Sequence, residues 1–157
     1  MTLLCTLDCN TRPLEALKRI LFMSTPLTHG HTGRWHWHTL CVNEQCMFVA
    51  FLDTYGLHKM SLDGKMIETY GKGGNKEGKF AGLYACMSDC DDNLLITDLG
   101  NNRLQLLHWK QWSTLQLQPP PLGPLNVVYN GHALYVVQWD TMALVKYEAI
   151  EWSPRLP

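Results

Sequence analysis

Residues 86–107 read CMSDCDDNLLITDLGNNRLQLL and contain the pattern that best indicates the fold of this 157-residue chain. An apolar run at 94–97 ends at Asp98, a turn rich in Gly and Asn follows, and a second apolar run begins after Arg103. Short runs of apolar and β-branched residues are typical of strands, and Asp, Asn and Gly accommodate tight turns. The stretch therefore predicts two strands joined by a turn.

The same pattern occurs twice more in the chain. Residues 41–60 read CVNEQCMFVAFLDTYGLHKM, and residues 128–147 read VYNGHALYVVQWDTMALVKY. The copies align on Asp53, Asp98 and Asp140, at intervals of roughly 43 residues, which is close to one four-stranded propeller blade. The small apolar residues predicted at the strand starts and the basic residues after each Asp are Cys41, Cys86 and Val128, and Lys59, Arg103 and Lys146. Because the three Asp residues recur in every copy, we predict that they serve the structure as turn caps.

The segment after the first copy completes one repeat unit. Asp63 and Gly64 indicate a hairpin turn between residues 59–61 and 66–70. The glycine-rich segment 71–80 (GKGGNKEGKF) follows, and a phosphate-binding loop of this kind would have to open a helix. The residues after Phe80 have the pattern of a strand instead. We therefore predict that 71–80 is a long turn between adjacent units.

Taken together, these features resemble the NHL repeat over residues 39–150. The NHL blade has a Gly-x-x-Gly, Gly-x-Phe, apolar strand, Asp and Asn-x-Arg pattern, and the matching residues are Gly71, Gly74, Gly78, Phe80, Asp98, Asn102 and Arg103. The chain departs from the pattern at Ala81-Gly82, where the family often has a Pro, and in having Asn102 and Arg103 adjacent. NHL propellers occur most often at the C-terminus of tripartite-motif ubiquitin ligases. The resemblance therefore implies a truncated part of such a tail.

We predict an all-β fold, a partial NHL-type β-propeller of about three four-stranded antiparallel blades. The blades occupy residues 27–70, 71–118 and 119–157, and residues 1–26 form a non-repeat segment with a short amphipathic helix at 13–23. A closed propeller has roughly 4 to 8 blades. Three blades therefore leave both terminal sheets partly exposed, and we expect a homodimer that completes the ring, or poor solubility.

The composition excludes several classes of function. Hydrophobic residues make up 46% of the chain and charged residues 17%, which argues against extensive disorder. The formal net charge of −1 argues against bulk electrostatic attraction to nucleic acid or membrane. No apolar stretch approaches the ~20 residues of a membrane-spanning helix, and the first ten residues lack the basic region of a signal peptide. We expect a cytoplasmic protein without a membrane partner.

No residue pattern indicates catalysis, a metal or another cofactor. The six cysteines fall in three pairs with three or four intervening residues, which is near to zinc-ligand spacing but not the usual two, and burial in strands accounts better for them. His36 and His38 would share one face of a strand and are the weak metal candidates, but a strand that packs Trp35 and Trp37 inward would place both His side chains in water. No Ser lies in a nucleophile-elbow motif. We predict a chain that is not an enzyme, with a metal-dependent NHL-type lyase fragment as the least favoured alternative.

Two binding functions remain. The resemblance implies a loop surface that recognises a protein partner or ligase substrate, in a chain that lacks a RING domain. The residues predicted for this surface are Tyr55, Leu57, Leu99, Asn101, Asn102, Arg103, Trp109 and Trp112. The alternative, which the resemblance also implies, is single-stranded RNA binding through Lys59, Lys72, Lys76, Lys79 and Arg103. That alternative requires basic residues to converge beside aromatic side chains that stack on bases.

Overall fold

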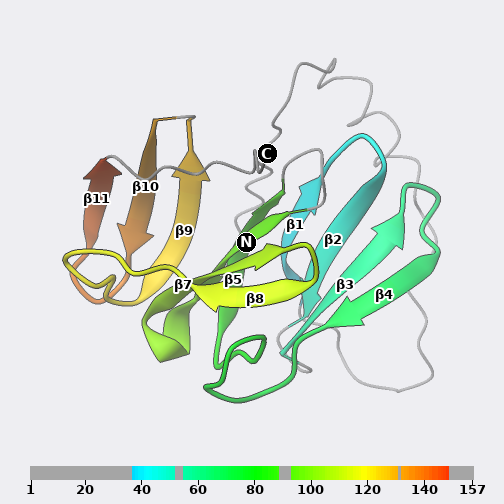
Figure 1. Cartoon of the computed structure of the whole chain (residues 1–157), viewed down its shortest axis with the longest axis horizontal. Coiled ribbons are helices and arrows are strands. Elements are labelled where there is room, and N and C mark those ends of the chain that lie inside the picture. The colour runs from blue at the N-terminus through cyan, green and yellow to red at the C-terminus, as the bar shows by residue number, and fades with distance from the viewer. Residues whose placement is uncertain (1–36, 52–54, 89–92, 131, 149–157) are drawn as a thin grey trace.

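The chain folds into three antiparallel β-sheets that follow one another along the sequence (Figure 1). A computed structural model describes residues 37–51, 55–88, 93–130 and 132–148. These residues form eleven strands and one 3-10 turn, without an α-helix. The all-β prediction is confirmed. The predicted N-terminal helix, His36 and Asp53 lie outside the described residues.

Each sheet is an up-and-down meander in which consecutive strands are neighbours. The first sheet contains β1 (Trp37–Val42), β2 (Cys46–Phe51), β3 (Gly56–Ser61) and β4 (Met66–Tyr70). The second contains β5 (Leu83–Ser88), β6 (Leu94–Asp98), the 3-10 turn η1 (Leu99–Asn101), β7 (Arg103–His108) and β8 (Gln111–Thr114). The described part of the third contains β9 (Pro124–Tyr129), β10 (Ala133–Gln138) and β11 (Ala143–Glu148). The apolar runs that precede the predicted turns therefore form the second strand of each sheet.

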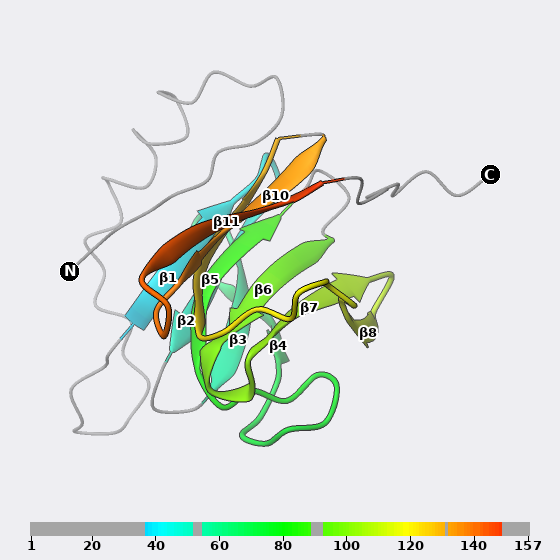
Figure 2. The same cartoon turned by 90° about the vertical axis from the view of Figure 1, so that its left-hand side faces the viewer.

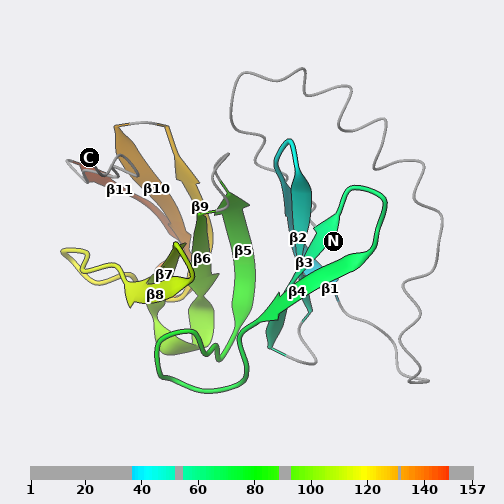
Figure 3. The same ribbon diagram turned by 45° about the vertical axis from the view of Figure 1, so that its right-hand side comes forward.

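The three sheets pack in sequence order, as Figure 2 and Figure 3 show from two further directions. The first strands of the sheets are neighbours, because β1 packs against β5, and β5 and β6 pack against β9. Propeller blades are arranged in the same way, with sheets repeated around an axis. The arrangement fits a partial β-propeller-like fold, in which the described sheets do not form a closed ring.

Strand β6 supplies apolar residues to two hydrophobic cores. Leu94 and Ile96 belong to the core between the first and second sheets, and Leu95 belongs to the core between the second and third. The first core contains Cys41, Cys46, Phe48, Ala50, Leu57, Phe80, Leu83, Cys86, Leu94, Ile96 and Leu107. The second contains Met87, Leu95, Leu104, Leu117, Val127, Leu134, Val136 and Tyr147. Burying one Leu or Ile stabilises a fold by roughly 2 kcal/mol, and a one-residue shift of β6 would exchange its two faces.

The predicted equivalence of Asp98 and Asp140 is wrong. Asp98 is the last residue of β6, is fully buried, and precedes the turn. Asp140 lies within the turn after β10 and is exposed, so the position equivalent to Asp98 is Gln138, the last residue of β10. Hydrogen bonds from Arg103 and Gln105 stabilise the Asp98 carboxylate in the sheet. Asp140 is accounted for by the general preference for Asp in tight turns.

Two other alignments of the repeat also need correction. Cys41, Cys86 and Val128 lie in the second half of β1, β5 and β9, not at the strand starts. Arg103 opens β7, whereas Lys59 and Lys146 are the fourth residues of β3 and β11. The structure therefore assigns Arg103 a role that the two lysines do not share.

Candidate interaction surface

The glycine-rich segment 71–80 fills one end of the junction between the first and second sheets, at the bottom of Figure 1. Its Phe80 is fully buried in the first core, and Gly73 forms a parallel β-bridge with Phe80. Gly71 and Gly78 have left-handed φ values of 81° and 70°, which glycine adopts readily. The segment connects two sheets, as predicted for a long turn between units.

Asp98 holds this segment in place through a buried polar network. Its carboxylate accepts hydrogen bonds from the Ala81 backbone N–H at 2.9 Å, Asn101 Nδ2 at 2.8 Å, Arg103 Nε at 2.9 Å and Gln105 Nε2 at 3.0 Å. Charged groups hydrogen-bonded in this manner are strongly stabilised in a low-dielectric interior. Asp98 is therefore a structural residue, but its partners are mainly side chains and not the turn backbone.

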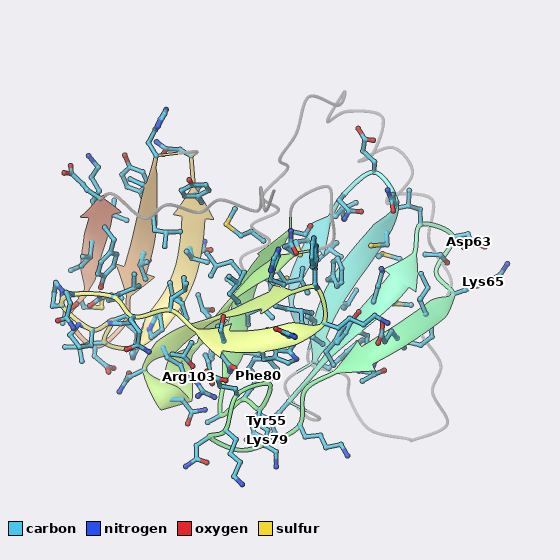
Figure 4. The ribbon with its side chains drawn as sticks, viewed as in Figure 1. Tyr55, Asp63, Lys65, Lys79, Phe80 and Arg103 are labelled. Atoms are coloured by element: carbon cyan, nitrogen blue, oxygen red, sulfur yellow. The ribbon has the colours of Figure 1, made fainter. Side chains whose placement is uncertain are left out.

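Arg103 extends the network to the glycine-rich segment. Its Nη2 donates to the carbonyl oxygens of Lys76 at 2.9 Å and Lys79 at 2.8 Å, while its Nε pairs with Asp98. Only 14% of the Arg103 side chain is exposed. Figure 4 shows Arg103 beside Phe80 at this end of the sheets. Arg103 thus belongs to the fold, which corrects its prediction as a contact residue for a protein or an RNA.

The predicted loop residues divide between two opposite rims. We define the lower rim by Tyr55 and segments 71–82, 99–102, 115–123 and 139–142, and the upper rim by segments 43–45, 62–65 and 109–110. Of the predicted residues, those on the lower rim are Tyr55, Leu99, Asn101 and Asn102. Asn101 donates to the Gly74 carbonyl at 2.9 Å and Asn102 Oδ1 accepts from the Gly123 N–H at 2.7 Å. Both Asn side chains therefore connect neighbouring segments of the rim.

Two predicted contact residues are core residues instead. Leu57 lies in β3 and is fully buried, so its prediction as a loop residue is wrong. Trp112 is half-buried, and its ring packs edge-on to those of Phe80 at 5.4 Å and Tyr70 at 6.4 Å. Gly78 lies against the Trp112 indole, where a Cβ atom would come within 2.8 Å of Cδ1. Trp112 thus helps to seal the junction that the glycine-rich segment fills.

Trp109 lies on the upper rim, apart from the other predicted contacts. Trp109 and Lys110 have φ values of 47° and 64° and form the tight turn between β7 and β8, a conformation that favours Asn and Gly. The Trp109 ring stacks on His108 with centroids 5.1 Å apart, yet 69% of the residue is exposed. A bulky exposed residue in this strained conformation is unusual. Trp109 therefore remains a candidate contact residue at this second location.

Three of the predicted basic residues share one segment. Lys72, Lys76 and Lys79 are exposed on the glycine-rich segment, whose Gly73 lies against the Tyr55 ring. Figure 4 places Tyr55 and Lys79 at the same end of the molecule. Lys59 is separate, because it lies in β3 with its Nζ 5.9 Å from the centroid of the Phe48 ring. The structure thus places the Tyr55 ring against the segment that carries the three lysines.

The described residues contain no group of three or more His, Cys, Asp or Glu side chains that could hold a metal ion. Cys41, Cys46 and Cys86 are buried in the first core, as predicted from strand burial. The side chain of His38, like all of His36, lies outside what the structure describes. In the part of the chain that the structure describes, no helix has the length and apolar character to cross a membrane.

The largest exposed apolar surface that sequence reasoning missed is on the third sheet. In β10, Val137 pairs with Leu144 of β11, and Tyr135 pairs with Val128 of β9, so these side chains point to the side away from the second sheet. Val128 and Val137 are each 39% exposed and Leu144 is 68% exposed. We call the surface formed by Val128, Val137 and Leu144, with the neighbouring turn residues Trp139 and Met142, the open face.

The first sheet provides the contrast. Its side away from the second sheet also carries apolar residues, and these form a third cluster of Val42, Met47, Val49, Phe51 and Met60. All five are buried. The two terminal sheets therefore differ in extent, because on the first sheet this cluster is covered and exposure is found at the edge strand β4, where Met66 pairs with Met60.

The open face has almost no net charge of its own. Lys146 and Glu148 lie on the same side of β11 and pair at 2.7 Å. The hydrogen bond from Lys146 lowers the pKa of Glu148, and the same bond raises the pKa of Lys146. Both groups are exposed, so water screens the pair and it contributes little to stability. An apolar partner surface on these strands would therefore meet Lys146 and Glu148 as a pair and not as two separate charges.

The chain resembles a solved structure, whereas the other comparisons with known proteins gave no match. No protein-family model matches the chain, and no curated protein matches it. Among solved structures, the chain is similar to a protein of unknown function from Bacteroides caccae, with 11% sequence identity and a TM-score of 0.47. The match covers 78% of this chain and 49% of that chain, so this chain spans about half the length of that protein. This likeness carries no information on function.

Proposed function

We propose that the chain is a non-catalytic interaction module, built as part of an NHL-type propeller, and that the open face of the third sheet binds a protein partner. The observation that carries the proposal is the exposure of Val128, Val137 and Leu144 on one side of the third sheet, next to the exposed turn residues Trp139 and Met142. Monomeric proteins rarely expose large contiguous apolar patches, and Trp and Met are enriched at protein interfaces. A second copy of the chain that completes the ring is one such partner.

The roles of the motif residues support the NHL resemblance. Asp98 and Arg103 fix the glycine-rich segment by hydrogen bonds, and Gly71 and Gly78 allow Phe80 and Trp112 to pack tightly against it. These positions are the ones that the NHL pattern specifies. By that resemblance, the chain would recognise a substrate or regulator for a ligase of the tripartite-motif type, without recruiting the conjugating enzyme itself.

The open face can be tested with the paired substitution Val137→Glu and Leu144→Lys. These residues are directly opposite on β10 and β11, so the introduced charges attract each other and we expect unfolding free energy to change by less than about 0.5 kcal/mol. The control is Met66→Glu with Ile67→Lys, because both residues are exposed apolar residues of β4 in the first sheet. We expect the first variant, but not the control, to lose partner binding.

The measurement compares the three chains by light scattering after size exclusion and by affinity purification of a tagged chain from cell extract. Self-association, or retention of a specific protein by the original chain and the control but not by the Val137→Glu, Leu144→Lys variant, supports the proposal. Equal retention of all proteins by the three chains would refute it.

Single-stranded RNA binding is the second candidate, since Lys72, Lys76 and Lys79 are exposed near Tyr55. Three phosphate contacts predict weak binding. The logarithm of the binding constant should fall with the logarithm of the salt concentration, with a slope of about −2. Replacing the three lysines by Ala should abolish it, while replacing Lys65 and Lys110 on the upper rim should not. Fluorescence anisotropy with a labelled RNA pool at several salt concentrations measures the salt dependence and the effect of each set of substitutions. Tight, sequence-selective binding at physiological salt would place RNA above the protein partner.

A further inference from the structure

Two cysteines face each other across the junction of the first and second sheets. The Cys86 thiol donates to Cys41 Sγ with the two sulfurs 3.0 Å apart. Cys41 lies in β1 and Cys86 in β5, the neighbouring first strands of their sheets, and both residues carry thiols. The sulfurs are within about 1 Å of the disulfide bond length, which is roughly 2.05 Å. Little movement separates this contact from a covalent bond.

Cys41 and Cys86 reach the junction from opposite sheets. Cys41 pairs with Phe48 of β2 and Cys86 pairs with Ile96 of β6, and all four residues belong to the first core. The third cysteine of the described residues, Cys46, is buried in the same core at the start of β2.

We propose that Cys41 and Cys86 form a reversible disulfide that joins the first and second sheets. The oxidant is a low-molecular-weight disulfide such as glutathione disulfide. One protein thiolate attacks a sulfur of that disulfide and releases one glutathione thiolate, and the second protein thiolate then attacks the mixed disulfide and releases the other. Two electrons pass to glutathione disulfide, and the two protons lost by the cysteines end on the two glutathione thiols.

The bond would act on the junction that holds the glycine-rich segment. It would join residues 45 positions apart in the sequence, and closing a loop of this size restricts the unfolded chain. Cys41 is fully buried and Cys86 is 3% exposed. Exchange therefore requires transient separation of the two sheets, and the bond, once formed, is shielded from reductants. The stability of the module would then depend on the surrounding redox conditions.

The test is to refold the full chain in mixtures of reduced and oxidised glutathione, block the remaining thiols, and map the cross-link by mass spectrometry. Cleavage after Glu44 and Asp89 separates Cys41 from Cys46 and Cys86 from Cys90. We expect a linked peptide pair containing Cys41 and Cys86, with the loss of two hydrogens. The melting temperature should rise by about 5 to 15 °C and fall again on reduction.

Two variants serve as the matched comparison. Cys86→Ala should lose the redox-dependent shift in melting temperature, and Cys46→Ala should keep it. Blocked thiols at both Cys41 and Cys86 after oxidative refolding, a cross-link between other cysteines, or an equal shift in Cys86→Ala would each overturn the proposal. Because the mapping uses the original chain, the result does not depend on whether either variant folds.

Discussion

Replacing Asp98 by Ala is expected to lower the free energy of unfolding by about 3–5 kcal/mol, because it removes one partner of a buried ion pair. The Asp98 carboxylate is fully buried and accepts four hydrogen bonds, including one from Arg103. Without it, the guanidinium of Arg103, which is 14% exposed, has no neutralising partner at this position. The glycine-rich segment would lose its attachment together with the turn.

Asp140→Ala is the matched control, because sequence alignment gave the two residues the same role. Asp140 is exposed in the turn after β10, so its removal should change the free energy of unfolding by less than about 0.5 kcal/mol. Urea unfolding followed by circular dichroism measures the free energy of unfolding of both variants. Similar losses for the two would mean that the network around Asp98 does not stabilise the fold.

The sequence predicted the strands well because their signal is local. Apolar runs, the turn residues after them, and the hairpin at Asp63-Gly64 all lie within a few positions of the elements they define. The repeat alignment failed at Asp98 for the opposite reason. Its environment is set partly by Arg103, which contacts Lys76 and Lys79, 27 and 24 positions away. No local pattern shows that an Asp before a turn is held by such contacts.

The open face could not be predicted for a related reason. The runs CMFVAF of β2 and ALYVVQ of β10 both carry apolar residues on both faces. Every residue of β2 is buried, whereas Val137 of β10 is exposed. Whether the second face of such a strand is covered depends on what packs against its sheet, and the strand sequence does not contain that information. Trp109 and Trp112 were both predicted as contact residues because aromatic anchors are typical of interfaces, and the structure exposes Trp109 but packs Trp112 against the first core.

Gly71→Ala is expected to destabilise the fold by about 3 kcal/mol, through backbone strain and overpacking together. Gly71 has a φ of 81°, and a Cβ atom there would come within 2.6 Å of Phe80 Cδ2 and 3.2 Å of the Tyr55 carbonyl oxygen. Phe80 is fully buried and packs against Trp112, so it cannot move without opening the first core. The damage should therefore spread from the segment to the junction of two sheets.

Gly73→Ala tests whether the loss of stability in Gly71→Ala comes from the close approach of its Cβ atom to Phe80. It makes the same chemical change two residues away. Its Cβ would lie 3.5 Å from the edge of the exposed Tyr55 ring, an ordinary contact, and the expected loss is below about 1 kcal/mol. Chemical unfolding gives the two stabilities, and the tryptophan emission of the folded variants, to which Trp112 contributes, reports whether the junction has opened. If Gly71→Ala retained both the stability and the emission of the original chain, Phe80 could not be the residue that closes the junction. The resemblance at Gly71 would then not rest on the room that this glycine leaves for the Phe80 ring.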